Sequence, residues 1–114
     1  MHYIGKIDKK IYRCVTNDIR TDEVIITDER IMHIKERHPN DYEKYFEYMR
    51  LIIEQPDYII EANKRNTAVV LKEINTNNEK FKLILRIVMK NDPKEYKNSI
   101  ISFWKIGNTT WKKP

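Results

Sequence analysis

The second half of the chain is dominated by segments that favour extended strands. Four stretches between residues 57 and 106 are rich in β-branched and aromatic residues: DYIIEA, TAVVLKEI, FKLILRIVM and NSIISFWKI. Between them, NTNNE (75–79) predicts a hairpin turn and KNDPKEYK (90–97) predicts a longer loop. Because short consecutive strands usually pair with their neighbours, this half of the chain predicts an antiparallel sheet.

The segment before these strands predicts two helices. Thr27 or Asp28 can cap a helix that runs to about His38. It should end there, because Pro39 disfavours helical geometry in the residue before it. A second helix is expected over residues 40–55. Its apolar side chains recur at helical spacing and are expected in the core: Tyr42, Tyr45, Phe46, Met49, Ile52 and Ile53.

Three shorter segments near the N-terminus also predict strands, namely HYIGKI (2–7), IYRCV (11–15) and EVIIT (23–27). The order of elements favours an α+β fold, in which N-terminal helices pack on one face of a four-stranded or slightly larger antiparallel sheet. A length of 114 residues predicts a single domain over residues 1–114.

The composition suggests a polyanionic partner. The chain has 22 Lys and Arg against 17 Asp and Glu, for a formal net charge of +5, and nucleic acid is a natural partner for such a surface. It has neither an apolar run of about 18 residues nor a signal-like start, so we expect no membrane span and a cytoplasmic location. Cys14 is the single cysteine, which argues against disulfides and a thiolate metal site.

Three of the predicted strands carry a polar residue where alternation predicts an apolar one. Arg86 lies between Ile84 and Val88 on one strand face, and Lys72 and Ser102 each share a face with apolar residues of their own strands. Each could be an isolated polar residue at the edge of a half-covered sheet. Since three strands each supply one, we expect a shared site in which Lys72 and Arg86 hold one anion.

His33 and His38 lie five residues apart in ERIMHIKERHPNDY. In a regular helix, Arg30, His33 and Arg37 form one stripe and His38 lies on another. Zinc-protease histidines lie four apart, so we expect no metal site. One interpretation is a solvated His33 and a His38 at the helix end. The other interpretation is that the histidines transfer protons in catalysis. Together with Arg, Lys and Ser side chains, histidine can cleave RNA without a metal, because the ribose 2′-hydroxyl is the nucleophile.

Three runs of the chain, VIITDERIMHIKERHPNDY, PDYIIEANKRNTAVVLKEI and NSIISFWKI, resemble the phage-associated barnase–EndoU–colicin–RelE-like nuclease domains. The resemblance extends from about Tyr3 to Trp111. It implies two helices on a four-stranded antiparallel sheet, with the ribonuclease site on the sheet face. These domains occur in phage and mobile-element proteins, often as toxin modules, which implies an immunity or antitoxin protein as a further partner.

Two short motifs resemble those of the tRNA-cleaving colicin D nucleases. Lys35-Glu36-Arg37-His38 resembles the basic run before their catalytic histidine, with Arg37 in place of a second lysine. Ser102-Phe103-Trp104 resembles their later Ser-x-Trp pair. His33 has no counterpart in that comparison but belongs to the HI-ERH pattern of the phage-associated family.

We therefore expect a metal-independent endoribonuclease or RNase-toxin domain that needs no cofactor and acts on tRNA or another structured RNA. His38 is the expected general base or acid and His33 its alternate or partner, while the phosphate is held or oriented by Lys72, Arg86 and Ser102. Four residues are expected to contact the RNA, the last by stacking on a base: Arg30, Lys35, Arg37 and Trp104. The alternatives are a catalytically inactive RNA- or protein-binding module and a structural phage component.

Overall fold

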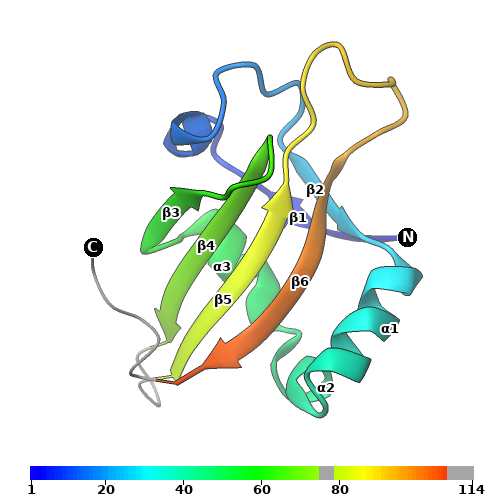
Figure 1. Cartoon of the computed structure of the whole chain (residues 1–114), viewed down its shortest axis with the longest axis vertical. Helices are drawn as coiled ribbons and strands as arrows, with labels where there is room; N and C mark the ends of the chain where they lie inside the picture. Colours follow the sequence, from blue (N-terminus) through cyan, green and yellow to red (C-terminus); the bar gives the residue numbers. More distant parts are fainter. Residues whose placement is uncertain (75–78, 108–114) are drawn as a thin grey trace.

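Six strands form one mixed sheet at the centre of the structure, a computed structural model that describes residues 1–74 and 79–107. They are β1 (His2–Lys6), β2 (Glu23–Ile26), β3 (Tyr58–Glu61), β4 (Thr67–Ile74), β5 (Glu79–Arg86) and β6 (Asn98–Ile106). Their order in the sheet is β1-β2-β6-β5-β4-β3 (Figure 1).

The sheet is larger than the sequence predicts. The four strands expected in the second half of the chain are present, and β3 to β6 pair antiparallel as expected. However, β1 and β2 extend the sheet, and β2 runs parallel to β6. The expectation of a purely antiparallel sheet is therefore wrong, because a strand from the first half of the chain pairs with the last strand. The hairpin turn predicted over residues 75–79 lies mostly outside the described residues.

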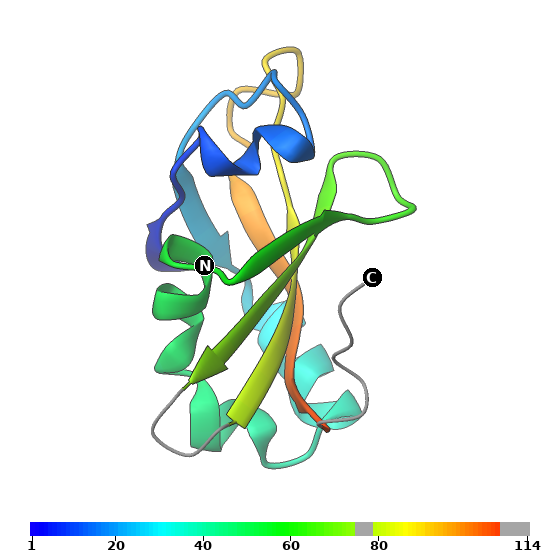
Figure 2. The same cartoon turned by 90° about the vertical axis from the view of Figure 1, so that its left-hand side faces the viewer.

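The described helices are the 3-10 helix η1 (Ile11–Cys14) and the α-helices α1 (Asp28–Arg37), α2 (Asp41–Tyr45) and α3 (Tyr48–Glu54). Helix α3 lies against one face of the sheet, whereas α1 and α2 lie beside β6 (Figures 1 and 2). No helix among the described residues covers the other face of β5 and β6, which carries Arg86, Ser102 and Trp104 and is called the open face below. None of the described helices has the length and apolar character needed to cross a bilayer.

Helix α1 begins and ends where the sequence predicts. The Thr27 hydroxyl accepts a hydrogen bond from the Arg30 backbone N–H at 3.2 Å, which satisfies one of the free donors of the first turn. The helix ends at Arg37, and His38 has the non-helical angles φ −133° and ψ 73°. Pro39 follows directly, and a following proline disfavours helical geometry at His38.

The second predicted helix is divided into α2 and α3 by a turn at Phe46 and Glu47. The Met49 N–H donates to the Phe46 carbonyl at 3.2 Å. This bond reaches the residue three before, so it closes a tighter turn than the α-helical bond to the residue four before. This break leaves α2 against the end of β6 while α3 lies against the sheet. Of the apolar stripe, Phe46 is 45% exposed, so it is not a core residue.

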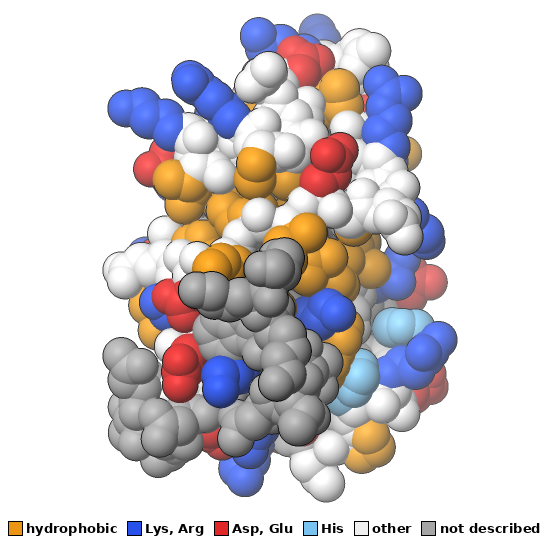
Figure 3. Space-filling view, turned by 60° about the vertical axis from the view of Figure 1, so that its left-hand side comes forward, with side chains coloured by type: hydrophobic (Ala, Val, Ile, Leu, Met, Phe, Trp, Pro, Cys, Tyr) orange, Lys and Arg blue, Asp and Glu red, His pale blue; other side chains and the backbone are white. Residues whose placement is uncertain are grey.

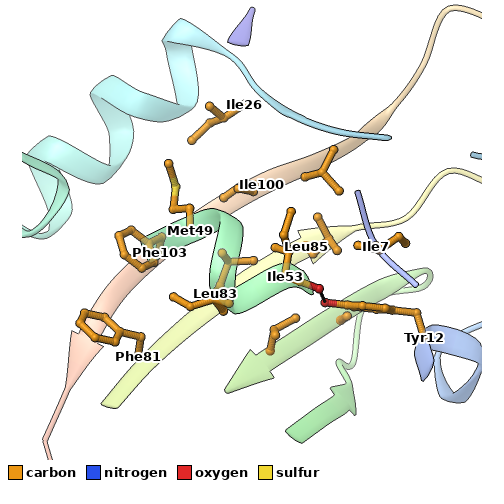
Figure 4. Packing of buried hydrophobic residues seen from close by; sticks show 14 of the residues in the cluster. Ile7, Tyr12, Ile26, Met49, Ile53, Phe81, Leu83, Leu85, Ile100 and Phe103 are labelled. Carbon is orange, nitrogen blue, oxygen red and sulfur yellow. Dashed lines mark hydrogen bonds between the residues drawn. The ribbon is translucent and has the colours of Figure 1, made fainter. Parts of the chain in front are cut away.

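The core lies between α3 and the sheet (Figure 4). Its largest fully buried side chains include Phe81, Phe103 and Tyr12. The Tyr12 hydroxyl donates to the Ile53 carbonyl at 2.9 Å, which gives the buried phenol a partner. The segment IYRCV was expected to be a strand, and this expectation is wrong: Ile11–Cys14 forms η1, which lets Tyr12 reach α3.

The loop between β5 and β6, residues 87–97, is held by polar contacts from the segment before β2. The Arg20 guanidinium donates hydrogen bonds to three carbonyls of this loop, those of Asp92, Lys94 and Tyr96. Asn98 is fully buried; its side chain accepts from the Val88 N–H at 2.8 Å and donates to the Thr21 carbonyl at 2.7 Å. The loop is therefore fixed at its tip and at its return to the sheet.

Candidate active site on the open sheet face

The open face is formed by neighbouring side chains of β5 and β6. Directly opposed residues of antiparallel strands project from the same face. The register places three pairs here: Lys82 opposite Trp104, Ile84 opposite Ser102, and Arg86 opposite Ser99. Arg86, Ser102 and Trp104, three of the residues predicted to form a site, therefore share one face.

A β-bulge in β6 sets this arrangement. Ser102 opposes Ile84 while Ile100 opposes Leu85, so Ile101 is an extra residue on β6. Uninterrupted alternation predicts that Ile100 and Ser102 share a face. Instead, Ile100 is fully buried in the core, and Ser102 keeps its place on the open face.

Lys72 lies on the opposite face of the sheet. It opposes the fully buried Phe81, whereas Arg86 opposes Thr67. The Lys72 Nζ lies 3.4 Å from the Asp57 Oδ1, and its side chain is only 18% exposed. The expectation that Lys72 and Arg86 hold one phosphate is therefore wrong, because the sheet separates them.

Arg86 projects into a groove of about 440 Å³ between the sheet and the N-terminal turn of α1, called the α1 groove. Arg30 lines the same groove from α1, and Ser99 lines it from β6. Among the described residues, no carboxylate forms an ion pair with Arg86 or Arg30, although Glu29 and Glu95 also line the groove. The fold thus brings two guanidinium groups from distant parts of the chain to one concave surface.

His38 lies at the other end of the open face, stacked on Trp104. The ring centroids are 4.7 Å apart and the planes are inclined by 5°. The Lys82 Nζ lies 5.6 Å from the centroid of the Trp104 ring, within the range of a cation–π contact. In Figure 3, histidine side chains border the hydrophobic surface next to Lys and Arg side chains.

The surroundings of His38 favour its neutral form. Burial lowers the pKa of the imidazole, and the charges of Arg37 and His33 lower it further, against an opposing effect of Asp41. A regular helix would have separated the two histidines. His38 lies just beyond the helical geometry of α1, and the charge of His33 acts on it electrostatically. A neutral imidazole at neutral pH is the form that can accept a proton.

Two further residues predicted to contact RNA, Lys35 and Arg37, lie on α1. The Lys35 Nζ is 3.5 Å from the Glu43 Oε2 and 5.5 Å from the centre of the Tyr42 ring, so it already has partners on α2. Arg37 is exposed on α1. Lys82, which the sequence analysis did not select, lies on the open face. The signal was available, since strand alternation places Lys82 on the face of Arg86.

No cluster of three or more His, Cys, Asp or Glu side chains suited to a metal ion is found within residues 1–74 and 79–107. The side chains of the open face offer an imidazole, a hydroxyl, guanidinium groups and an ammonium group. Such a set can transfer a proton and stabilise negative charge on a phosphate.

The comparisons with known proteins agree with this chemistry. The model of the family described as phage-Barnase-EndoU-ColicinE5/D-RelE like nuclease2 matches residues 1–113. No curated protein matches the chain significantly, and neither does any solved structure.

Proposed function

The chain belongs to the phage-Barnase-EndoU-ColicinE5/D-RelE like nuclease2 family, and on this premise we propose that it is a metal-independent endoribonuclease. The observation that carries the proposal is the shared open face, which carries Arg86 and the Ser102 hydroxyl and, at its other end, the half-buried His38 stacked on Trp104. The proposed substrate is structured RNA, and tRNA is the first candidate. A role as a toxin module controlled by an immunity protein belongs to the same proposal.

In the proposed reaction the 2′-oxygen of a ribose attacks the adjacent phosphorus. Neutral His38 accepts the proton of that hydroxyl as the new P–O bond forms. The P–O5′ bond breaks, and the leaving 5′-oxygen receives a proton from His33, which is assigned the role of general acid. The products are a 2′,3′-cyclic phosphate and a 5′-hydroxyl end. No metal takes part in these steps, because the nucleophile belongs to the substrate.

Arg86 and Ser102 are assigned to the scissile phosphate. Arg86 can offer two parallel N–H donors to the phosphate oxygens, and no carboxylate of the described residues forms an ion pair with it. Its charge stabilises the phosphorane most strongly as negative charge develops, which accelerates the reaction. Ser102 lies two residues before Trp104 on β6, so both project from the same face, and Ser102 is assigned to orienting a phosphate oxygen or a proton.

Trp104 is assigned to positioning His38. The sequence suggested that it stacks on a base of the RNA, but one face of its ring is already stacked on the imidazole. A planar contact restricts the rotation of the imidazole about its side-chain bonds and limits its exposure to water. Trp104 therefore acts through His38, and Lys82 is a better candidate than Lys72 for a second cation near the phosphate.

Total tRNA incubated with the purified protein in excess EDTA tests the proposal. The wild-type protein should cleave, and His38→Ala should lose cleavage without losing its folded circular dichroism spectrum. The exposed Lys9→Ala serves as the control, since Lys9 lines neither the α1 groove nor the open face. Binding of tRNA without cleavage would favour the inactive binding module, and cleavage that stops in EDTA would contradict the metal-independent mechanism.

A further inference from the structure

A second concave surface lies beside the turn between β3 and β4. This groove of about 420 Å³, called the turn groove, is lined by Lys64, Arg65, Asn66, Arg86, Asn91 and Asp92, together with two neighbouring residues. We propose that it binds the sugar–phosphate backbone of single-stranded RNA that flanks the scissile phosphate. The inference rests on the proposed function, because it extends the substrate path from the same arginine.

Arg86 connects the two grooves. It lines the α1 groove together with Arg30, and it lines the turn groove together with Lys64 and Arg65. A strand whose scissile phosphate contacts Arg86 therefore has a cationic groove on each side. Proteins that bind single strands without reading their sequence commonly follow the backbone along such a positively charged groove.

The turn that carries Lys64 and Arg65 is anchored to the sheet. Asn66 has the left-handed angle φ 59°, and its carbonyl accepts a hydrogen bond from the Ile87 N–H at 2.8 Å. The Thr67 hydroxyl donates to the Arg65 carbonyl at 3.1 Å. Because Ile87 directly follows Arg86, the turn is fixed next to the residue that is assigned to the phosphate.

The turn groove is lined by three cations, Lys64, Arg65 and Arg86, and by one carboxylate, that of Asp92. Lys64 and Arg65 are exposed, and no described carboxylate forms an ion pair with either of them. Asp92 is the acidic residue of the lining, and its Oδ2 accepts a hydrogen bond from the Met89 N–H at 2.8 Å. The cations are therefore available to an anionic ligand, and the amide side chain of Asn91 can donate further hydrogen bonds.

Fluorescence anisotropy with a labelled 12-nucleotide single strand tests this assignment. The probe has mixed sequence and 2′-O-methyl groups throughout, so it lacks the nucleophile and binding is measured without cleavage. The test variant is Lys64→Gln with Arg65→Gln. The matched control is Lys10→Gln with Arg13→Gln, which removes the same two charges from exposed positions that line neither groove. Charge-preserving Lys64→Arg with Arg65→Lys shows whether charge alone matters.

The readout is the slope of log affinity against log salt concentration, which for single strands changes by about 0.7 for each phosphate contact. Losing two contacts should make the slope of the test variant shallower by about 1.4, while the control and the charge-preserving variant keep the wild-type slope. An unchanged slope, or an equal change in the control, would overturn the turn groove as a site. Failure of the proposed function is a separate result, since the wild-type protein would then not cleave RNA whatever the slope.

Discussion

Replacing Lys72 or Arg86 by methionine should separate folding from catalysis, because these two cations lie on adjacent strands but on opposite faces of the sheet. The Lys72 ammonium is 3.4 Å from the Asp57 carboxylate, with side-chain exposures of 18% and 37%. A pair that is partly screened by solvent contributes about 1 kcal/mol, the upper end of the range for surface ion pairs. Methionine keeps most of the packing of the stem, so Lys72→Met should lower Tm by roughly 4 °C.

Arg86→Met should have the opposite effect: it should lower the rate of cleavage and leave the stability nearly unchanged. Arg86 is exposed, so its loss should change the free energy of unfolding by no more than about 0.5 kcal/mol. Removing one donor to the transition state typically lowers kcat by about 100-fold or more. Thermal melts followed by circular dichroism and initial rates of tRNA cleavage measure both quantities on the same samples. If Lys72→Met abolished cleavage at an unchanged Tm, the separation of the two residues by the sheet would be refuted.

Three further perturbations test the surroundings of the site. Trp104→Ala should reduce kcat, because it removes a stacked contact with His38 that is worth about 0.5–1.5 kcal/mol of interaction energy. Trp104→Phe keeps an aromatic ring and should keep most of the wild-type kcat. Equal rates for the two variants would count against a positioning role for Trp104. The folded-state pKa of His38 lies below its ordinary 6.5, so the unfolded chain takes up this proton first as the pH falls. Urea titrations should therefore show wild-type stability rising with pH from that lowered pKa to about 6.5, and His38→Gln should lack this component of the rise. Asn98→Ala should lower the free energy of unfolding by about 2–5 kcal/mol in urea titrations, because it leaves the Val88 N–H and the Thr21 carbonyl without their buried partner; a loss below about 0.5 kcal/mol would refute this.

Local signals in the sequence were sufficient for α1 and for the existence of β3 to β6. The cap at Thr27 and the effect of Pro39 on His38 act within a few residues, so they can be recognised without the fold. The pairing of β2 with β6 joins segments about 70 residues apart, and no local pattern indicates it. The prediction of a strand around Tyr12 was wrong for a related reason: the buried contact of Tyr12 with Ile53 outweighs the strand propensity of the segment.

The positions of the site residues also depend on strand pairing, which local sequence patterns do not show. Alternation correctly separates the two faces within β4 and within β5, but it does not say which face of one strand meets which face of the next. That depends on the hairpin register, and a shift by one residue exchanges the faces. Arg86 opposes Thr67, so Lys72 lies on the other side of the sheet. The bulge at Ile101 likewise separates Ile100 from Ser102, and alternation alone gives no sign of it.

A single 2′-deoxy substitution in the RNA is the most direct test of the proposed mechanism. An RNA oligonucleotide cleaved by the wild-type protein in EDTA is resynthesised with deoxyribose on the 5′ side of the scissile phosphate, and both RNAs are compared by gel and mass spectrometry. We predict that the all-ribose RNA yields a 2′,3′-cyclic phosphate end, and that cleavage at the substituted position is abolished because the attacking hydroxyl is missing. Cleavage of the deoxy-substituted RNA at the same position and rate would show that water or a protein group is the nucleophile, and it would contradict the role assigned to His38 as the base that takes the 2′-hydroxyl proton.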